Sequence, residues 1–131
     1  MLGAFNEAEY QRVFRSMEQD RADGLMVSDE PEHGYYRATI VEWAAKGRIP
    51  AIYPLRDFVD AGGLMAYSPD QAEIYRHLAN LIDKIFRGAN PGDIPFYQPT
   101  KFELSINLKT AKALGLEMPA MLLGRGDEVI E

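Results

Sequence analysis

The residues best suited to bind a small molecule follow short apolar segments. Asp29 and Glu30 come directly after the run Leu25–Val27. Their carboxylates can accept hydrogen bonds from an amino group or from hydroxyls of a ligand. A solvated acidic turn that caps the next helix explains the same two residues equally well. Both interpretations stay open at this point.

A second group of candidates surrounds the apolar run 51–53. Tyr53 and Tyr67 could stack on a ligand, and Arg56 could pair with a carboxylate through two hydrogen bonds. Each of these side chains could instead serve packing or lie on the surface. Gly62 and Gly63 could let a ligand approach the backbone closely, but a tight turn accounts for them as well.

Other kinds of chemistry have little support in the sequence. There is no cysteine, and the two histidines, His33 and His77, lie far apart in the sequence, so we expect no metal site. No serine lies in a Gly-x-Ser-x-Gly motif. The glycine-rich phosphate-binding motifs Gly-x-x-x-x-Gly-Lys and Gly-x-Gly-x-x-Gly do not occur either. We therefore predict a protein that is not an enzyme, with no metal and no cofactor.

Composition is that of an ordinary globular protein. The chain has 131 residues, of which 47% are hydrophobic and 26% charged, so we expect one domain over residues 1–131. A formal charge of −6 argues against a nucleic-acid partner. The start Met1–Glu7 has neither a basic region nor an apolar core, so we predict no signal peptide and a cytoplasmic location if the chain is expressed as given.

Hydrophobic periodicity predicts alternating helices and strands. In the first half we expect a helix from the cap Asn6 to about Asp20, a buried strand Leu25–Val27, a loop Ser28–Gly34, a helix Tyr35–Lys46, a strand Ala51–Tyr53 and a short turn or helix Arg56–Asp60. This order is typical of parallel strands joined by crossovers.

The second half continues with a strand at Leu64–Tyr67. Ser68 is expected to cap a long helix that starts at Pro69 and ends near Phe86. The later elements are a connection Ala89–Pro99, a strand Lys101–Asn107 with one solvated face, a helix Leu108–Leu114, a short helix Pro119–Leu123 and a partly frayed acidic tail Gly126–Glu131.

The long helix carries a wide apolar stripe, formed by Ile74, Leu78, Leu81, Ile82, Ile85 and Phe86. So many large apolar side chains need a partner surface. The helix could fold back onto its own sheet, or it could pair with a second copy. We predict a homodimer with the helix Pro69–Phe86 in the interface.

Several segments together resemble one family of proteins. They are Arg21–Val27, Gly47–Tyr53, Gly62–Tyr67, Ile85–Pro95 and Pro99–Leu116. The chain is similar to ABC-transporter substrate-binding proteins, in the family that includes tryptophan- and tyrosine-binding lipoproteins. The resemblance covers nearly the whole chain.

The resemblance implies a type I periplasmic binding protein fold. This chain would be a three-layer, Rossmann-like lobe with a parallel sheet. It would be equivalent to the second, C-terminal lobe of a two-lobed protein that is truncated so that the first lobe is missing. Its cleft positions would be Asp29, Glu30, Tyr53 and the pair Gly62–Gly63.

The family's partners are a small-molecule ligand, such as an amino acid, and an ABC permease. The location implied is periplasmic or membrane-anchored. The alternative function is that of a truncated, self-associating α/β protein with no transport role of its own.

Overall fold

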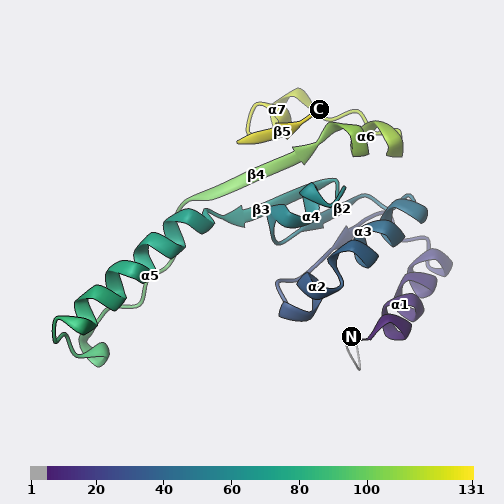
Figure 1. Ribbon diagram of the computed structural model, residues 1–131. Helices are drawn as coiled ribbons and strands as arrows, with labels where there is room; N and C mark the ends of the chain where they lie inside the picture. Colours follow the sequence, from purple (N-terminus) through teal and green to yellow (C-terminus); the bar gives the residue numbers. More distant parts are fainter. Residues whose placement is uncertain (1–5) are drawn as a thin grey trace.

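The computed structural model describes residues 6–131, which form an α/β fold around a five-stranded sheet (Figure 1). The strands follow one another across the sheet in chain order: β1 (Leu25–Met26), β2 (Ala51–Tyr53), β3 (Met65–Pro69), β4 (Phe102–Asn107) and β5 (Glu128–Ile130). The helices are α1 (Glu7–Gln19), α2 (Pro31–Tyr35), α3 (Arg37–Lys46), α4 (Arg56–Asp60), α5 (Gln71–Phe86), α6 (Leu108–Leu114), α7 (Ala120–Leu123) and the 3-10 helix η1 (Pro91–Asp93). The predicted alternation of helices and strands is confirmed.

The sheet is parallel except at one pair of strands. β1, β2 and β3 run parallel, as the alternating pattern predicts. β4 is antiparallel to β3, with Met65 opposite Ile106 and Pro69 opposite Phe102. β5 then lies parallel to β4. The chain leaves the sheet at the carboxyl end of β3 and returns to the sheet at that same end. β4 must therefore run in the opposite direction.

The acidic tail is ordered against the sheet, so the prediction of a frayed end is wrong. Asp127 holds it in place: its backbone N–H donates to the Leu104 carbonyl at 2.9 Å, and its carboxylate accepts from the Leu104 N–H at 2.8 Å. These two bonds align the following residues with β4, where they form β5.

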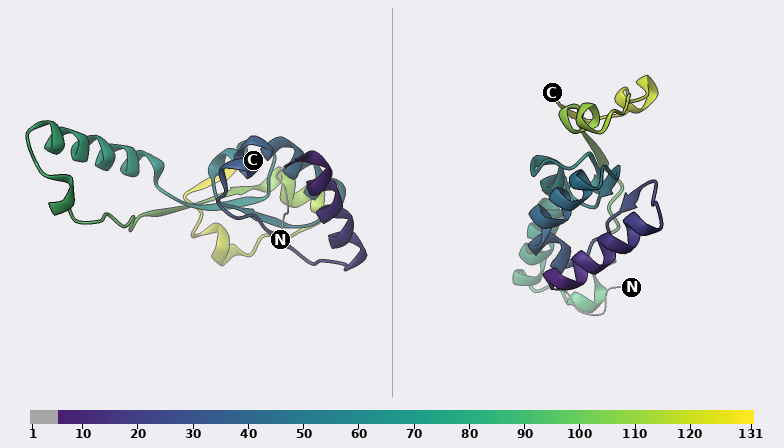
Figure 2. Two further views of the ribbon diagram at one scale, coloured as in Figure 1. Left: turned by 90° about the horizontal axis from the view of Figure 1, so that it is seen from below. Right: turned by 90° about the vertical axis from the view of Figure 1, so that its right-hand side faces the viewer.

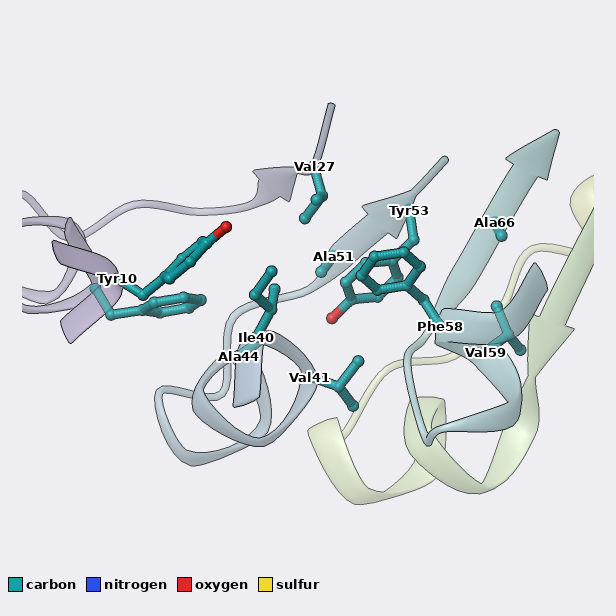
Figure 3. Close-up of a cluster of buried hydrophobic side chains, with 11 residues drawn as sticks. Tyr10, Val27, Ile40, Val41, Ala44, Ala51, Tyr53, Phe58, Val59 and Ala66 are labelled. Atoms are coloured by element: carbon teal, nitrogen blue, oxygen red, sulfur yellow. The ribbon is translucent and has the colours of Figure 1, made fainter. Parts of the chain in front are cut away.

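The main core lies between the sheet and the helices α3 and α4 (Figure 3). The Tyr53 ring of β2 is 2% exposed and stacks on Phe58 of α4, with the ring centroids 5.0 Å apart. α1 extends this core through Tyr10 and Phe14. Burial of these aromatic and branched side chains is the main favourable contribution to folding.

The opposite face of the sheet is covered unevenly. Figure 2 shows α7 on the side of the sheet away from α2 and α3, and Ile106 of β4 is fully buried on this far face. Over β1 and β3 the same face is open: Met26 is 82% exposed and Tyr67 is 55% exposed. The expectation that β1 is a buried strand is therefore wrong for Met26.

β4 also departs from its predicted pattern. Ser105 and Asn107, expected on a solvated face, are 5% and 7% exposed because this face turns toward α4. The Asn107 side chain donates to the Val59 carbonyl at 3.4 Å and accepts from the Thr110 N–H at 3.1 Å, which caps α6.

The long helix starts later than the sequence predicts. Ser68 and Pro69 belong to β3, because pairing with β4 keeps them extended. Asp70 is the actual N-cap, and its Oδ1 accepts from the Glu73 N–H at 3.0 Å. By contrast, Asn6 caps α1 as predicted, accepting from the Glu9 N–H at 3.0 Å.

The segment Ser28–Gly34, predicted as a loop, contains most of the short helix α2. Pro31 stands in the first turn of α2, where its missing N–H costs nothing. His33 is buried, and its Nδ1 lies 2.9 Å from the Ser28 carbonyl oxygen, so it fixes the turn after β1. The following helix, α3, starts at Arg37 instead of Tyr35.

Residues 70–101, which we call the arm, project away from the sheet (Figure 1 and the left view of Figure 2). α5 contains no buried residue, so it does not fold back onto its own sheet. The return segment packs along it: the Tyr97 hydroxyl donates to Glu73 at 2.9 Å and its ring stacks on His77. No helix within residues 6–131, α5 included, is long and apolar enough to cross a membrane.

We expect Gly63→Ala to destabilise the fold. A methyl group there would lie 2.5 Å from Cε2 of Tyr53 and 2.7 Å from the Phe58 carbonyl oxygen. Overpacking of this kind costs about 1–3 kcal/mol in the free energy of unfolding. Urea unfolding measures the loss.

Gly34→Ala is the matched control, because nothing lies within 4 Å of an added methyl group at this helical position. It should leave stability unchanged or raise it by up to about 1 kcal/mol. Equal stability of both variants would contradict the packing described for Tyr53.

Candidate functional site

A groove of about 550 Å³ opens where β2 and β3 end and α5 begins. The carboxyl ends of parallel strands meet at one edge of a sheet, which is where open α/β folds hold their ligands. The groove is lined by Leu55, Arg56, Asp57, Ser68, Pro69, Asp70, Gln71, Ala72, Tyr75 and Glu103. It therefore lies between the body of the sheet and the base of the arm.

Asp70 joins the arm to the sheet at this groove. Its carboxylate is largely buried and accepts from Lys101 Nζ at 2.7 Å while it caps α5. The hydrogen bond from Lys101, aided by that from the Glu73 N–H, lowers the pKa of Asp70. The same bond raises the pKa of Lys101. Both groups are therefore charged at neutral pH.

Arg56 reaches from α4 to the last strand. Its guanidinium lies 2.7 Å from Glu128 Oε1 and 3.5 Å from Asp60 Oδ2. Asp57, one residue later, forms an ion pair with Arg37, whose Nη1 lies 3.4 Å from Asp57 Oδ2. Because two carboxylates already surround the Arg56 charge, a ligand carboxylate would have to share or replace them.

Asp29 and Glu30 follow β1 and are both exposed, at the same edge of the sheet but outside the groove lining. Glu30 is the N-cap residue of α2, yet its side chain makes no capping hydrogen bond. The helix-cap explanation is thus not seen for Glu30. A ligand-binding role for the two carboxylates stays a prediction.

Tyr53 and Gly63 have packing roles in this structure. Tyr53 lies in the core, and burial raises the pKa of its hydroxyl to about 12. The Tyr53 ring occupies the space beside Gly63, so the close approach is made by a side chain of the protein and not by a ligand.

The pair Gly62–Gly63 also lies at the wrong edge of the sheet for the predicted site. It precedes β3, whereas the groove is at the carboxyl ends of the strands. Gly62 has a φ of +103°, and its carbonyl accepts from the Thr110 hydroxyl at 2.8 Å. The tight-turn interpretation explains both glycines.

Tyr67 lies outside the groove as well. It points to the far face of β3, where its ring stacks on Phe102 with centroids 5.3 Å apart. Of the residues predicted from the sequence, Arg56 does line the groove.

Sequence reasoning missed most of the groove. Asp57, Ser68, Asp70, Tyr75 and Glu103 line it. Asp70 follows the expected helix start Ser68–Pro69, and this local signal does not reveal its ion pair with Lys101. Within residues 6–131, no group of three or more His, Cys, Asp or Glu residues could hold a metal ion.

Comparison with known families gives one match over almost the entire chain. A family described as "ABC transporter substrate binding protein" matches residues 3–130. No curated protein sequence matches the chain.

Solved structures share the fold at low sequence identity. A conserved domain protein from Vibrio cholerae is 19% identical with a TM-score of 0.87, over 96% of this chain and 42% of its own. An ABC domain from Streptococcus pneumoniae in complex with L-Trp is 24% identical with a TM-score of 0.85, over 94% of this chain and 42% of its own.

A third similar structure is the ligand-free, open form of a substrate-binding protein with adhesive properties from Clostridium difficile. It is 20% identical with a TM-score of 0.66, over 95% of this chain and 41% of its own. At these identities the likeness shows the fold alone, and the chain spans less than half the length of these proteins.

The ion pair between Asp70 and Lys101 gives a pH-dependent prediction. Asp70→Asn keeps a cap acceptor for α5 but removes the charge that Lys101 binds. Folding lowers the pKa of Asp70. Its carboxylate therefore stabilises the fold at pH values above its ordinary pKa of about 3.9, and this stabilisation is lost as the pH falls through the lowered pKa of the folded state.

We therefore expect Asp70→Asn to be less stable than wild type at pH 7 and equally stable in strongly acidic solution. Urea unfolding at several pH values measures the difference. Asp23→Asn is the control, since Asp23 is exposed and has no ion pair with a described residue. A stability difference that persists unchanged to strongly acidic pH would contradict the role of the pair.

Proposed function

The chain belongs to the family of ABC transporter substrate-binding proteins, and we propose that residues 1–131 supply the second lobe of a two-lobed solute-binding protein. The observation that carries the proposal is the position of the groove, at the carboxyl ends of β2 and β3 and open on one side. The first lobe, placed on that open side, would enclose a ligand. The role is binding and release, with no covalent step.

We propose an amino acid as the solute. The groove carries carboxylates on α4, β4 and the arm, and the Arg56 guanidinium lies among them. Groups of both signs suit a zwitterion, which has an ammonium and a carboxylate close together. The structural relative from Streptococcus pneumoniae holds L-Trp, which supports the same class.

The arm links ligand binding to the relative position of the lobes. Gln71 and Tyr75 reach the groove from α5, and Arg56 and Asp57 reach it from α4. A ligand that touches both sets favours one orientation of the arm. In an importer, the ABC permease in the membrane would recognise this closed form on the extracytoplasmic side.

Amino-acid binding to this chain alone should be weak. An open groove buries less of a ligand than the 70–90% typical of a pocket, so we expect a Kd of about 1 mM or weaker. Titration of the isotope-labelled chain followed by NMR measures the Kd and locates the site.

Amide shifts should concentrate at Arg56, Ser68 and Tyr75. Micromolar affinity would contradict the one-sided site. Shifts confined to residues outside the groove would contradict its role as the binding site.

Self-association is a second candidate function, favoured by the apolar face of the arm. Tyr75 is 66% exposed and Phe86 85%, and Leu78, Ile82 and Ile85 lie between them at 39–48%. Phe96 on the return segment is fully exposed. A patch of this kind on a soluble protein usually marks an interface. In a two-lobed protein the first lobe would cover it, and for this chain we propose a second copy.

Light scattering should therefore give a homodimer at tens of micromolar. Leu78→Glu with Ile82→Glu should produce a monomer, because both side chains lie within the apolar face. Arg76→Ala with Asn80→Glu changes the net charge by the same amount on the polar side of α5 and should leave the dimer intact. A wild-type monomer, or a dimer that the first variant leaves intact, would contradict this interface.

A further inference from the structure

Resting on the proposed solute-binding function, we infer that Ser68 and Glu103 form the subsite for the ligand's ammonium group. The two residues are far apart in sequence but directly opposite each other in the β3–β4 pair. Directly opposed residues of an antiparallel pair point to the same face, and both of these line the groove.

Ser68 provides a hydroxyl that has no partner within the described part of the chain and is reached by solvent. The residue is 5% exposed, and its side chain makes no hydrogen bond to any residue in the range 6–131. Because Ser68 lines the groove, a donor on a ligand there can bond to this hydroxyl.

Glu103 provides the charge beside that hydroxyl. Its side chain is 41% exposed, and Lys101 approaches Oε1 at 3.5 Å, a longer contact than the 2.7 Å between Lys101 and Asp70. Lys101 therefore binds mainly to Asp70. Among the described residues no partner contacts Glu103 Oε2, which is left to accept from a ligand.

The surrounding charges favour a cation over a neutral donor. The carboxylates in and next to the groove are Asp57, Asp60, Asp70, Glu103 and Glu128, and the cations paired with them are Arg37, Arg56 and Lys101. Because the carboxylates outnumber the cations, the groove has a negative potential. An ammonium group also has three donors, enough to reach both Ser68 and Glu103.

NMR titrations with three probes test the subsite: L-tryptophan, 3-indolepropionate, which lacks the ammonium group, and ethylammonium. Wild type should prefer L-tryptophan to 3-indolepropionate, and ethylammonium should shift the amides of Ser68 and Glu103. Ser68→Ala and Glu103→Gln should each weaken L-tryptophan binding about three- to tenfold, the effect of one lost hydrogen bond, and neither should weaken the binding of 3-indolepropionate.

Ser105→Ala is the matched control. Ser105 is also 5% exposed and without a side-chain hydrogen bond to a described residue, and it lies on the same face of β4, but it does not line the groove. It should bind L-tryptophan like wild type. If Ser68→Ala fails to fold, Glu103→Gln carries the test, because Glu103 is partly exposed.

The outcomes separate the subsite from the function on which it rests. Unchanged L-tryptophan binding in both variants would overturn the subsite and leave the proposed function standing. Groove shifts with ethylammonium but not with L-tryptophan would support the subsite and overturn the choice of an amino acid. Shifts with none of the probes would overturn both.

Discussion

The antiparallel pairing of β3 with β4 is the constraint on which the rest of the structure depends. It keeps Ser68 and Pro69 extended, so Asp70 becomes the N-cap of α5, and the helix points away from the sheet. It brings Glu103 opposite Ser68, and it provides the edge on which β5 lies. The arm, the groove and the C-terminal part of the sheet therefore share one set of backbone hydrogen bonds.

Features encoded by neighbouring residues could be predicted from the sequence. The Asn6 cap and the apolar spacing define α1, and Gly115, with a φ of +75°, ends α6. Strand β2 and helix α5 follow from hydrophobic pattern alone. Each of these signals lies within about one or two turns of chain, where spacing largely decides conformation.

Features that depend on distant residues could not be predicted. The pattern at Ser68–Asp70 is a good helix start, but pairing with Phe102 and Glu103 overrides it. The burial of Tyr53 depends on which face of β2 lies under α4, and a strand of three residues does not specify this. Most of the groove was missed for the same reason, because strands and helices far apart in sequence form it.

The arm is, in effect, a long loop inserted between two paired strands. The entropy of closing such a loop grows only with the logarithm of its length, so doubling it would cost about 0.6 kcal/mol. Residues 87–95, which form the outer end of the arm, contact no part of the sheet and are almost all exposed. Insertions and deletions there should be tolerated in evolution, provided that Asp70 and Lys101 still meet at the base.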